Sequence, residues 1–288
     1  MGPGERDLKR LIVTGDDFGL SLPVNRAIEM AHGDGILTTA CLMVAAPMAA
    51  DAVDRAKRLP CLGVGLHVVV VRGRATLPPA AIPDLVDRDG RFDNNLVRAG
   101  LRYFFLPNVR RQLAAEIRAQ FEAFRATGLR LDHANAHNHM QLHPTVLGLI
   151  IRIGAPHGLR AMRVPFEPLA GAGVRSMTRL GGWLLLAPWI AAMKRRMARA
   201  GIRYNDRVFG LADTGRMDRE RVMTLLRCLP DGITEMFFHP ATDDAWPEAD
   251  PNAAGFRFRD ELAALVDAGV RARVAATGAR LARFSDLD

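Results

Sequence analysis

The sequence has few cysteines, few tyrosines and tryptophans, and no long apolar run. Only 3 of its 288 residues are cysteine, 2 are tyrosine and 3 are tryptophan. Cys41, Cys61 and Cys228 are scattered and odd in number, which excludes a disulfide scaffold and is typical of reduced thiols in the cytosol. No apolar run reaches the ~20 residues that span a bilayer, and no signal peptide is visible. We therefore expect a globular, cytoplasmic protein.

Two common nucleotide-binding motifs are missing as well. No G-x-G-x-x-G follows the first apolar run and no G-x-x-x-x-G-K-S/T occurs anywhere, so a nucleotide-binding fold has no support. The chain is 49% hydrophobic, and its short apolar runs alternate with helical stretches from end to end. This alternation predicts one α/β domain over residues 1–288, built as a barrel-like closed sheet of parallel strands.

The expected elements follow from apolar periodicity and from the positions of proline and glycine. Strands are expected at residues 11–14, 38–44, 62–66, 129–134, 159–164, 208–211 and 233–238, and helices at 22–32, 49–58, 108–127, 145–157 and 218–229. The stretches 258–268 and 270–275 complete the alternation, and Asn108 is the expected cap of its helix. Residues 72–107 are weakly patterned, which predicts an excursion over an active-site face.

Polar side chains stand where several of the expected strands end. They are Asp16 and Asp17 after the first strand, His67 after the third, His137 and His139 after the fourth, Arg163 at the end of the fifth, and His239 after a late strand. In a parallel barrel the loops at the carboxyl ends of the strands converge. We therefore expect these side chains to form one site.

The acids and histidines of this set are suited to binding a metal. Two adjacent carboxylates push their pKa values apart, so Asp17 or Asp16 can bind a cation while the other accepts a proton. Four of the chain's 8 histidines fall at residues 133–143, and an extended His-x-His directs both rings to one side. One Asp and two His are a usual ligand set for a catalytic divalent metal. The alternatives are a solvated turn for the acids, a core histidine for His67 and a surface histidine tract.

Two further residues have roles that the pattern leaves open. His239 ends a buried-looking strand, where an imidazole can deliver a proton to a leaving group or simply bond to the backbone. Arg163 can hold a carboxylate or the substrate, or it can form an ordinary salt bridge.

Four short motifs in this order resemble the YdjC-like carbohydrate deacetylase family, most closely its hopanoid-biosynthesis-associated HpnK branch. They are V-T-G-D-D-F-G at 13–19, G-L-H at 65–67, N-A-H-N-H at 135–139 and E-M-F-F-H-P-A at 235–241. The resemblance covers nearly the whole chain. It implies a distorted (β/α) barrel of the polysaccharide-deacetylase type and metal-dependent removal of an N-acetyl group from a GlcNAc-type sugar, such as the headgroup of a glycosylated hopanoid lipid.

The resemblance also implies residue roles. By position, the metal ligands are Asp17, His67 and His137, the catalytic base is Asp16, the acid is His239, and the residues around them or at the substrate are Asn135, His139 and His143. The ligand set accommodates Zn²⁺ or Mg²⁺, and also Co²⁺ or Mn²⁺. The family commonly has Asp where this chain has Asn135, and often His where it has Gln141.

Two other functions are compatible with the same sequence. The first is an enzyme that deacetylates soluble chito-oligosaccharides, whose turnover a lipid aglycone on the sugar would not raise. Alternatively, the chain would be a non-catalytic, membrane-associated scaffold of lipid synthesis that keeps a relic site.

The net charge of +8 is concentrated in one segment. Residues 170–203 contain seven Lys and Arg and no Asp or Glu, so the other 254 residues sum to +1. The same segment carries Trp183 and Trp189 in an eleven-residue apolar run, which is too short to span a bilayer. It is compatible with a core helix, a homodimer contact or a peripheral helix on the anionic inner face of the cytoplasmic membrane. No motif supports nucleic-acid binding.

Overall fold

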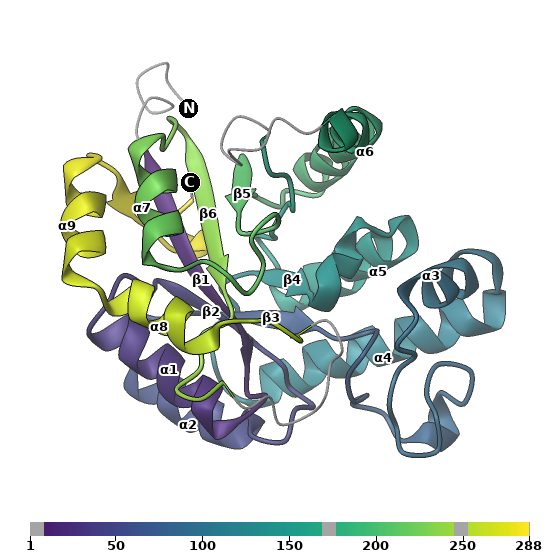
Figure 1. Ribbon diagram of the computed structural model, residues 1–288. Helices are drawn as coiled ribbons and strands as arrows, with labels where there is room; N and C mark the ends of the chain where they lie inside the picture. The colour runs from purple at the N-terminus through teal and green to yellow at the C-terminus, as the bar shows by residue number, and fades with distance from the viewer. Residues whose placement is uncertain (1–8, 169–176, 245–252, 288) are drawn as a thin grey trace.

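The computed structural model describes residues 9–168, 177–244 and 253–287, and a curled parallel sheet forms its centre (Figure 1). The sheet order is β4-β3-β2-β1-β6-β5, with β7 paired to β1. The strands are β1 (Arg10–Phe18), β2 (Thr39–Leu42), β3 (Gly63–Val68), β4 (Ala134–Ala136), β5 (Arg207–Phe209), β6 (Ile233–Phe238) and β7 (Arg280–Leu281), and every pairing among them is parallel.

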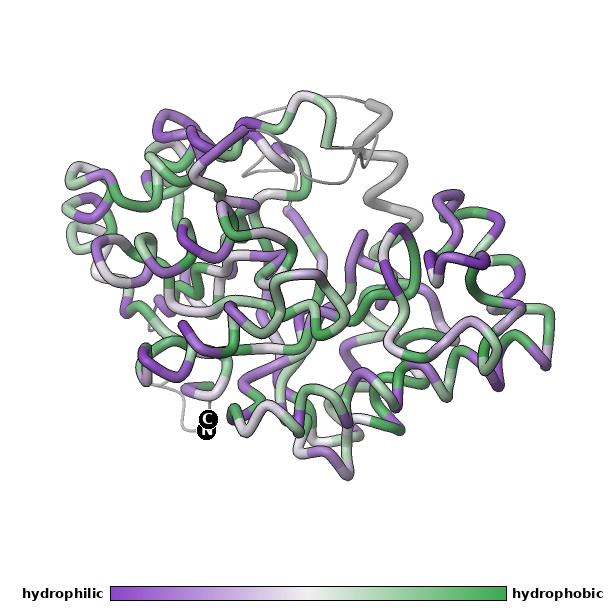
Figure 2. Tube along the Cα trace, turned by 90° about the horizontal axis from the view of Figure 1, so that it is seen from below, coloured by the Kyte–Doolittle hydropathy of each residue, from purple (hydrophilic) through white to green (hydrophobic). Residues whose placement is uncertain are grey.

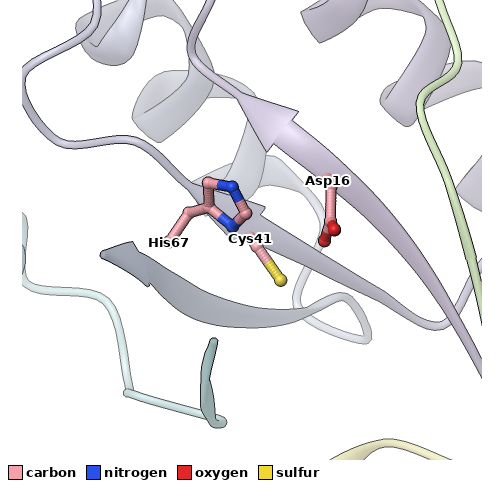
Figure 3. Close-up of side chains that lie close together, drawn as sticks. All are labelled: Asp16, Cys41 and His67. Atoms are coloured by element: carbon pink, nitrogen blue, oxygen red, sulfur yellow. The ribbon is translucent and has the colours of Figure 1, made fainter. Parts of the chain in front are cut away.

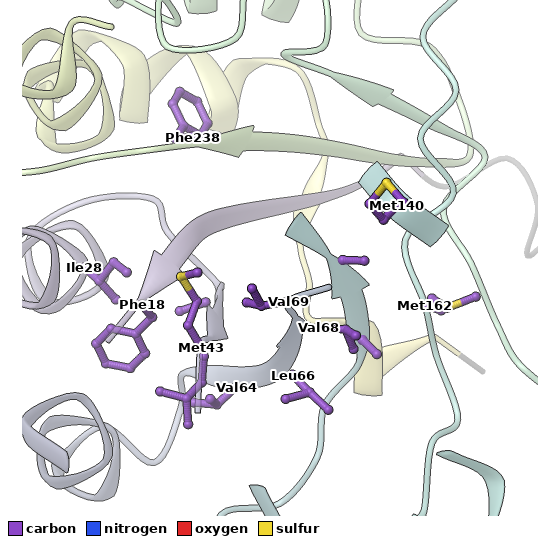
Figure 4. Packing of buried hydrophobic residues seen from close by; sticks show 14 of the residues in the cluster. Phe18, Ile28, Met43, Val64, Leu66, Val68, Val69, Met140, Met162 and Phe238 are labelled. Carbon is purple, nitrogen blue, oxygen red and sulfur yellow. The ribbon is translucent and has the colours of Figure 1, made fainter. Parts of the chain in front are cut away.

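Helices flank this sheet, and most of them bury apolar side chains toward the sheet or toward one another. They are α1 (Leu22–Gly33), α2 (Ala49–Arg58), α3 (Leu96–Phe105), α4 (Pro107–Ala126), α5 (Pro144–Gly154), α6 (Met177–Arg199), α7 (Arg219–Arg227), α8 (Phe258–Val266) and α9 (Ala268–Ala276). Hydrophobic and hydrophilic stretches alternate along the outer helices, as amphipathic helices require (Figure 2). Phe18 of β1 and Ile28 of α1 are fully buried in one core cluster with Met43 (Figure 4).

The two ends of the curled sheet are joined by the extended segment Arg160–Phe166. Its backbone pairs with β4 through Ala134 N–H to Ala161 O at 3.0 Å and Arg163 N–H to Ala134 O at 3.1 Å. On its other side Val208 N–H of β5 donates to Phe166 O at 2.8 Å. The expected strand at 159–164 is therefore reduced to isolated bridges and hydrogen bonds, but it closes the sheet. The fold class predicted from the sequence, a distorted α/β barrel, is confirmed.

The predicted elements differ from the observed ones in several places. The strand expected at 129–134 is observed as β4 at Ala134–Ala136, and helix α3 lies within the expected excursion at 72–107. Both stretches at the end of the chain are helices, because Val270 and Val274 are buried one helical turn apart on α9. Helix α4 begins at Pro107, so Asn108 lies inside its first turn and does not cap it. Strand β3 runs to Val68, which places His67 within the strand rather than beyond it.

Within the basic segment at 170–203, helix α6 spans Met177–Arg199. Ile190, Met193 and Met197 are buried against the body of the protein, and the indole N–H of Trp189 donates to Leu142 O at 2.8 Å. Trp183 lies outside the side chains that the structure describes. No helix in the described part of the chain combines the length and hydropathy needed to cross a membrane.

Two glycines of β3 make room for a pair of buried polar side chains. A β-carbon at Gly63 would lie 2.9 Å from Asp132 Cγ, and one at Gly65 would lie 2.6 Å from His133 Cε1. His133 is fully buried, donates from Nδ1 to Asp132 Oδ2 at 2.9 Å, and stacks on Phe284 with 4.3 Å between the ring centroids. The strand therefore packs directly against an imidazole that has no space to move away.

We expect Gly65→Ala to lower the free energy of unfolding by about 1–3 kcal/mol, the usual cost of overpacking a filled core. The measurement is urea unfolding followed by circular dichroism. Gly33→Ala is the matched control, since a β-carbon there meets nothing within 4 Å, and it should not destabilise the protein. Equal stabilities of the two variants would contradict the close packing of β3 on His133.

Candidate active site

A pocket of about 350 Å³ opens at the carboxyl ends of β1, β3, β4 and β6. Its lining combines acids, histidines and a few apolar side chains: Asp16, Asp17, His67, Arg72, Leu96, Ala136, His137, Asn138, His139, Thr214, His239, Ala253 and Phe256. The volume is in the range of small-molecule sites, about 300–1,000 Å³. Parallel strands bring these residues together because their carboxyl ends lie on the same rim.

Three ligand-type atoms converge in this pocket. Asp17 Oδ1 lies 3.3 Å from His67 Nε2 and 3.2 Å from His137 Nδ1, and the two nitrogens are 3.2 Å apart. Tetrahedral coordination with metal–ligand bonds of about 2.0–2.1 Å places neighbouring ligand atoms about 3.3–3.4 Å apart. The triangle formed by these three residues therefore fits one divalent metal ion.

The electrostatics of this triangle favour a cation. Burial raises the pKa of Asp17, but the charge and hydrogen bond of His137 outweigh burial and hold the pKa well below its usual value. Burial lowers the pKa of His67, yet hydrogen bonding to Asp17 and the charges of Asp16 and Asp17 raise it overall. The negative charges of Asp16 and Asp17, which raise the pKa of His67, also attract a metal ion.

The backbone at the site is held in an unusual conformation. Asp17 has φ of 62°, and Asn138 and His139 have φ of 51° and 55°, in the left-handed region that side chains other than glycine seldom adopt. Gln141 stabilises the turn that contains Asn138 and His139, because its Oε1 accepts a hydrogen bond from the backbone N–H of Ala136 at 3.1 Å. Such strain is concentrated at functional sites, where the surrounding structure enforces it.

A second cluster of possible ligands, Asp16, Cys41 and His67, is less suited to a metal (Figure 3). Both oxygens of Asp16 already accept hydrogen bonds from Arg163, at 2.6 and 3.0 Å. The Cys41 sulfur lies 3.1 Å from His133 Nε2, and burial followed by the charge of Asp16 raises the pKa of the thiol well above its usual value. Cys41 is therefore a neutral buried thiol, and of the two clusters the one formed by Asp17, His67 and His137 is better suited to a metal.

Arg163 forms a buried ion pair with two carboxylates. It is 0% exposed, binds Asp16 with two nitrogens, and donates from Nε and Nη2 to Glu235 Oε1 at 2.9 and 2.7 Å. Burial raises the pKa of Asp16, but the charge of Arg163 outweighs burial and lowers the pKa far enough to keep the carboxylate ionised. Arg163 therefore forms a salt bridge within the protein, with the carboxylates of Asp16 and Glu235.

Asn135 connects the metal triangle to this ion pair. Its Oδ1 lies 2.7 Å from His67 Nδ1, and its Nδ2 donates to Asp16 Oδ1 at 3.0 Å. An amide oxygen can only accept, so His67 donates from Nδ1, and its Nε2 is the ring nitrogen that faces Asp17 and His137. The amide thus orients a metal-ligand imidazole as a carboxylate would, and also donates to Asp16.

His239 lines the other side of the pocket, packed edge-on to Phe237 and against Phe256. Its Nδ1 is buried with no hydrogen-bond partner among the described residues, and burial lowers the pKa of the ring although Asp17 and Asp16 oppose the shift. The backbone N–H of His239 donates to Glu261 Oε2 at 2.5 Å. Burial raises the pKa of Glu261 to about 7.

The two remaining histidines of the sequence-based set lie in different places. His139 lines the pocket beside Phe237, and burial followed by the charge of Arg163 lowers its pKa to about 3, so the ring is neutral. His143 is not among the residues described as lining the pocket; it packs against Tyr103 and Phe104 of α3. The expectation that His143 contacts the substrate or the ligands therefore does not agree with its position.

Three residues that contact the site, Glu235, Cys41 and Glu261, were not identified as site residues from the sequence. Glu235 belongs to a recognised motif, and an acid inside an otherwise apolar strand is a usable signal. Cys41 and Glu261 lie in segments with no local feature that points to the pocket. Only the packing of β2 and α8 places them near Asp16 and His239.

Comparisons with known proteins agree with this architecture. The model of the family described as YdjC-like protein matches residues 10–276. A carbohydrate deacetylase of Geobacillus stearothermophilus is 30% identical over 278 residues, 96% of this chain and 97% of that protein. A carbohydrate deacetylase of Brevibacillus brevis is 38% identical over 144 residues, so the match spans 50% of this chain and about half the length, 55%, of that relative. The solved Enterococcus faecalis V583 protein EF3048 is similar in fold, with a TM-score of 0.75 at 22% identity over 97% of this chain and 99% of that one.

We expect Asn135→Ala to lower the affinity for Zn²⁺ or Mn²⁺ by about 10–100-fold, because His67 loses the partner that fixes its tautomer. Asn135→Asp, which keeps an acceptor for His67, should retain most of the affinity. Isothermal titration of the chelator-stripped protein measures both. Asn205→Ala removes another buried amide, one that bonds the Val164 backbone, and should leave the affinity unchanged. Wild-type affinity in a folded Asn135→Ala protein would contradict the bridging role.

Proposed function

The chain belongs to the YdjC-like protein family, and on that premise we propose that it is a metal-dependent hydrolase that removes the N-acetyl group from an amino sugar. The observation that carries the proposal is the triangle of Asp17 Oδ1, His67 Nε2 and His137 Nδ1, with sides of 3.2–3.3 Å, in one pocket with Asp16 and His239. The names of the relatives, carbohydrate deacetylases, supply the class of substrate.

In this proposal the two adjacent aspartates have different roles. When bound at the triangle, a divalent ion supplies Lewis-acid polarisation of the amide carbonyl and makes the attacking water more acidic. Asp17 stays with the two histidines. Asp16 Oδ2 accepts a hydrogen bond from Arg163 Nη1, and a carboxylate oxygen has a second lone pair that can accept one from the attacking water. Because Arg163 keeps Asp16 ionised, the base is ready at neutral pH, although its basicity is reduced.

His239 is the group that we propose to protonate the departing amine. Its lowered pKa leaves the ring neutral at pH 7, so it takes up a proton from solvent before it donates one to the amine nitrogen, and Asp16 returns the proton of the attacking water to solvent. The nearby charges of Asp16 and Asp17 favour the protonated ring, while Phe237 and Phe256 hold it in place. The backbone hydrogen bond to Glu261 fixes the position of the residue at the end of β6.

We further propose that the sugar is the headgroup of a lipid, a glycosylated hopanoid, at the inner face of the cytoplasmic membrane. The motif resemblance to the HpnK branch and the basic segment at 170–203 support this assignment. Within that segment the membrane contact would come from exposed arginines such as Arg195 and Arg199, since Trp189 is bonded to the body of the protein. The 72–107 excursion would border the substrate, because Arg72 and Leu96 line the pocket.

Asp17→Ala and His67→Ala are each expected to lose bound metal and to lower acetate release from N,N′-diacetylchitobiose by at least about a hundredfold. The assay compares chelator-stripped protein with protein reloaded with Zn²⁺, Mg²⁺, Mn²⁺ or Co²⁺, and metal content is measured alongside. His157→Ala changes a histidine that bonds Ile153 O on α5 and should keep both properties. Full metal content and turnover in either ligand variant would refute the assignment.

The lipid assignment predicts at least about a tenfold higher kcat/KM for a GlcNAc-hopanoid in detergent than for the soluble disaccharide, because the aglycone adds binding energy. Acetate release from both substrates is compared in the same detergent. A soluble GlcNAc glycoside with a short alkyl chain is the control for the linkage itself. Equal values for all three sugars would favour soluble chito-oligosaccharides as the substrate.

A further inference from the structure

Helix α3 carries an exposed apolar stripe, which we call the α3 face. Its members and their exposed fractions are Val97 at 73%, Leu101 at 54%, Phe104 at 49% and Phe105 at 65%. Their spacing of four, three and one residues puts them on one side of the helix, while Ala99 and Tyr103 are buried on the other. Monomeric proteins seldom leave a continuous apolar stripe in water, so this face is expected to have a partner.

Beside it lies a basic groove of about 680 Å³ between α4, α5 and α6, which we call the arginine groove. It is lined by Pro107, Arg110, Arg111, Ala114, Pro144, Thr145, Gly148, Leu149, Ile151, Arg152 and Arg196. The lining contains four arginines and no acid. None of the four forms an ion pair within the described part of the chain. Four neighbouring guanidinium groups without counter-charges attract an anionic ligand.

The groove is built to keep its arginines at the surface. The guanidinium of Arg196 lies over Gly148 of α5, where a β-carbon would be 2.4 Å from Nη2. Arg196 is thereby held across the first turns of α5. Arg111 is held by a 2.7 Å hydrogen bond to Asn108 on its own helix. These contacts orient the charges without neutralising them.

The α3 face and the arginine groove are continuous. Phe105 ends α3, Leu106 is 45% exposed, and Pro107 begins α4 and already lines the groove. The turn that joins the two helices lies at the right-hand edge of the molecule in Figure 1. Apolar side chains therefore project from the protein directly next to a set of uncompensated positive charges.

We propose that the α3 face and the arginine groove form a docking surface for an anionic lipid bilayer. Apolar side chains that enter the acyl boundary beside arginines that meet phosphate headgroups are the two requirements of an interfacial helix. A second copy of the chain is the less suitable occupant, because a two-fold interface would bring the arginine grooves of both copies close to one another. A protein partner would have to supply acids and a hydrophobic groove together.

The position of this surface deepens the proposed function and rests on its lipid-linked substrate. Leu96, the first residue of α3, lines the catalytic pocket, and its neighbour Val97 is the most exposed member of the α3 face. The pocket therefore opens next to the surface that would lie on the membrane. A sugar headgroup can enter the pocket while its lipid remains in the bilayer.

The test is co-sedimentation of the full chain with vesicles of phosphatidylcholine alone or mixed with phosphatidylglycerol. We expect binding to the anionic vesicles, and loss of at least about tenfold in Arg110→Glu/Arg152→Glu, since each basic residue near the surface contributes about fivefold. Leu101→Ser/Phe105→Ser should also bind at least about tenfold more weakly, and should do so at high salt as well as low salt.

Matched control variants make the same kinds of substitution at other positions on the surface. Arg227→Glu/Arg271→Glu makes the same net charge change at exposed arginines of α7 and α9, on the opposite side of the molecule from α3 (Figure 1), and Met30→Ser replaces an exposed apolar residue of α1. Both should bind vesicles as the wild type does. Equal binding by groove, face and control variants would overturn the proposal, as would no vesicle binding by the wild type or binding only to inorganic phosphate.

Acetate release from the soluble disaccharide is measured on every variant and separates this proposal from the proposed function. Unchanged release with lost vesicle binding supports the docking surface. Vesicle binding that depends on the groove, in a protein with no deacetylation of any sugar, would refute the proposed function and leave the docking surface standing. Deacetylation by a protein that does not bind vesicles would refute the docking surface and leave the proposed deacetylase activity standing.

Discussion

The buried ion pair between Arg163 and Asp16 is the interaction on which most of the site depends. Arg163 comes from the extended segment that closes the sheet, Asp16 from β1, and the second acceptor, Glu235, from β6. Removing such charges from water costs several kcal/mol per ion, which only close, multiple hydrogen bonds offset. The bidentate geometry provides them, so closure of the barrel and ionisation of Asp16 are enforced by the same contacts.

From this pair a chain of hydrogen bonds leads to the metal triangle. Asn135 donates to Asp16 and accepts from His67, whose other nitrogen faces Asp17 and His137. Environment thus separates two adjacent carboxylates: a guanidinium neutralises Asp16, while imidazoles surround Asp17 and leave it suited to a cation. The positive φ of Asp17 interrupts the regular strand at a place where Asp16 and Asp17 both line the pocket, so one strand end supplies both carboxylates.

Much of the fold could be predicted from the sequence, because buried parallel strands have compact apolar runs and amphipathic helices have a regular period. Strand β6 and helix α2 have the predicted bounds. The prediction left the element type at 270–275 undefined, because the valines of α9 suit either a strand or a helix until burial on one side decides. It was incomplete at 159–164, where a single irregular strand is stabilised mainly by its neighbours. Of the predicted site residues, the structure brings Asp16, Asp17, His67, His137, His139 and His239 to one pocket and leaves His143 outside it.

The sequence by itself determined the class of fold and the chemical types available at the strand ends, because both are written in local patterns and short motifs. Tertiary structure alone decided what each group does. It placed Arg163 on Asp16 rather than on a substrate, and it used Asn135 to orient His67. It bonded Trp189 to the protein body and turned the apolar side of α3 outward. Charge pairing, tautomer and exposure depend on distances between residues far apart in the chain, and no local pattern encodes those distances.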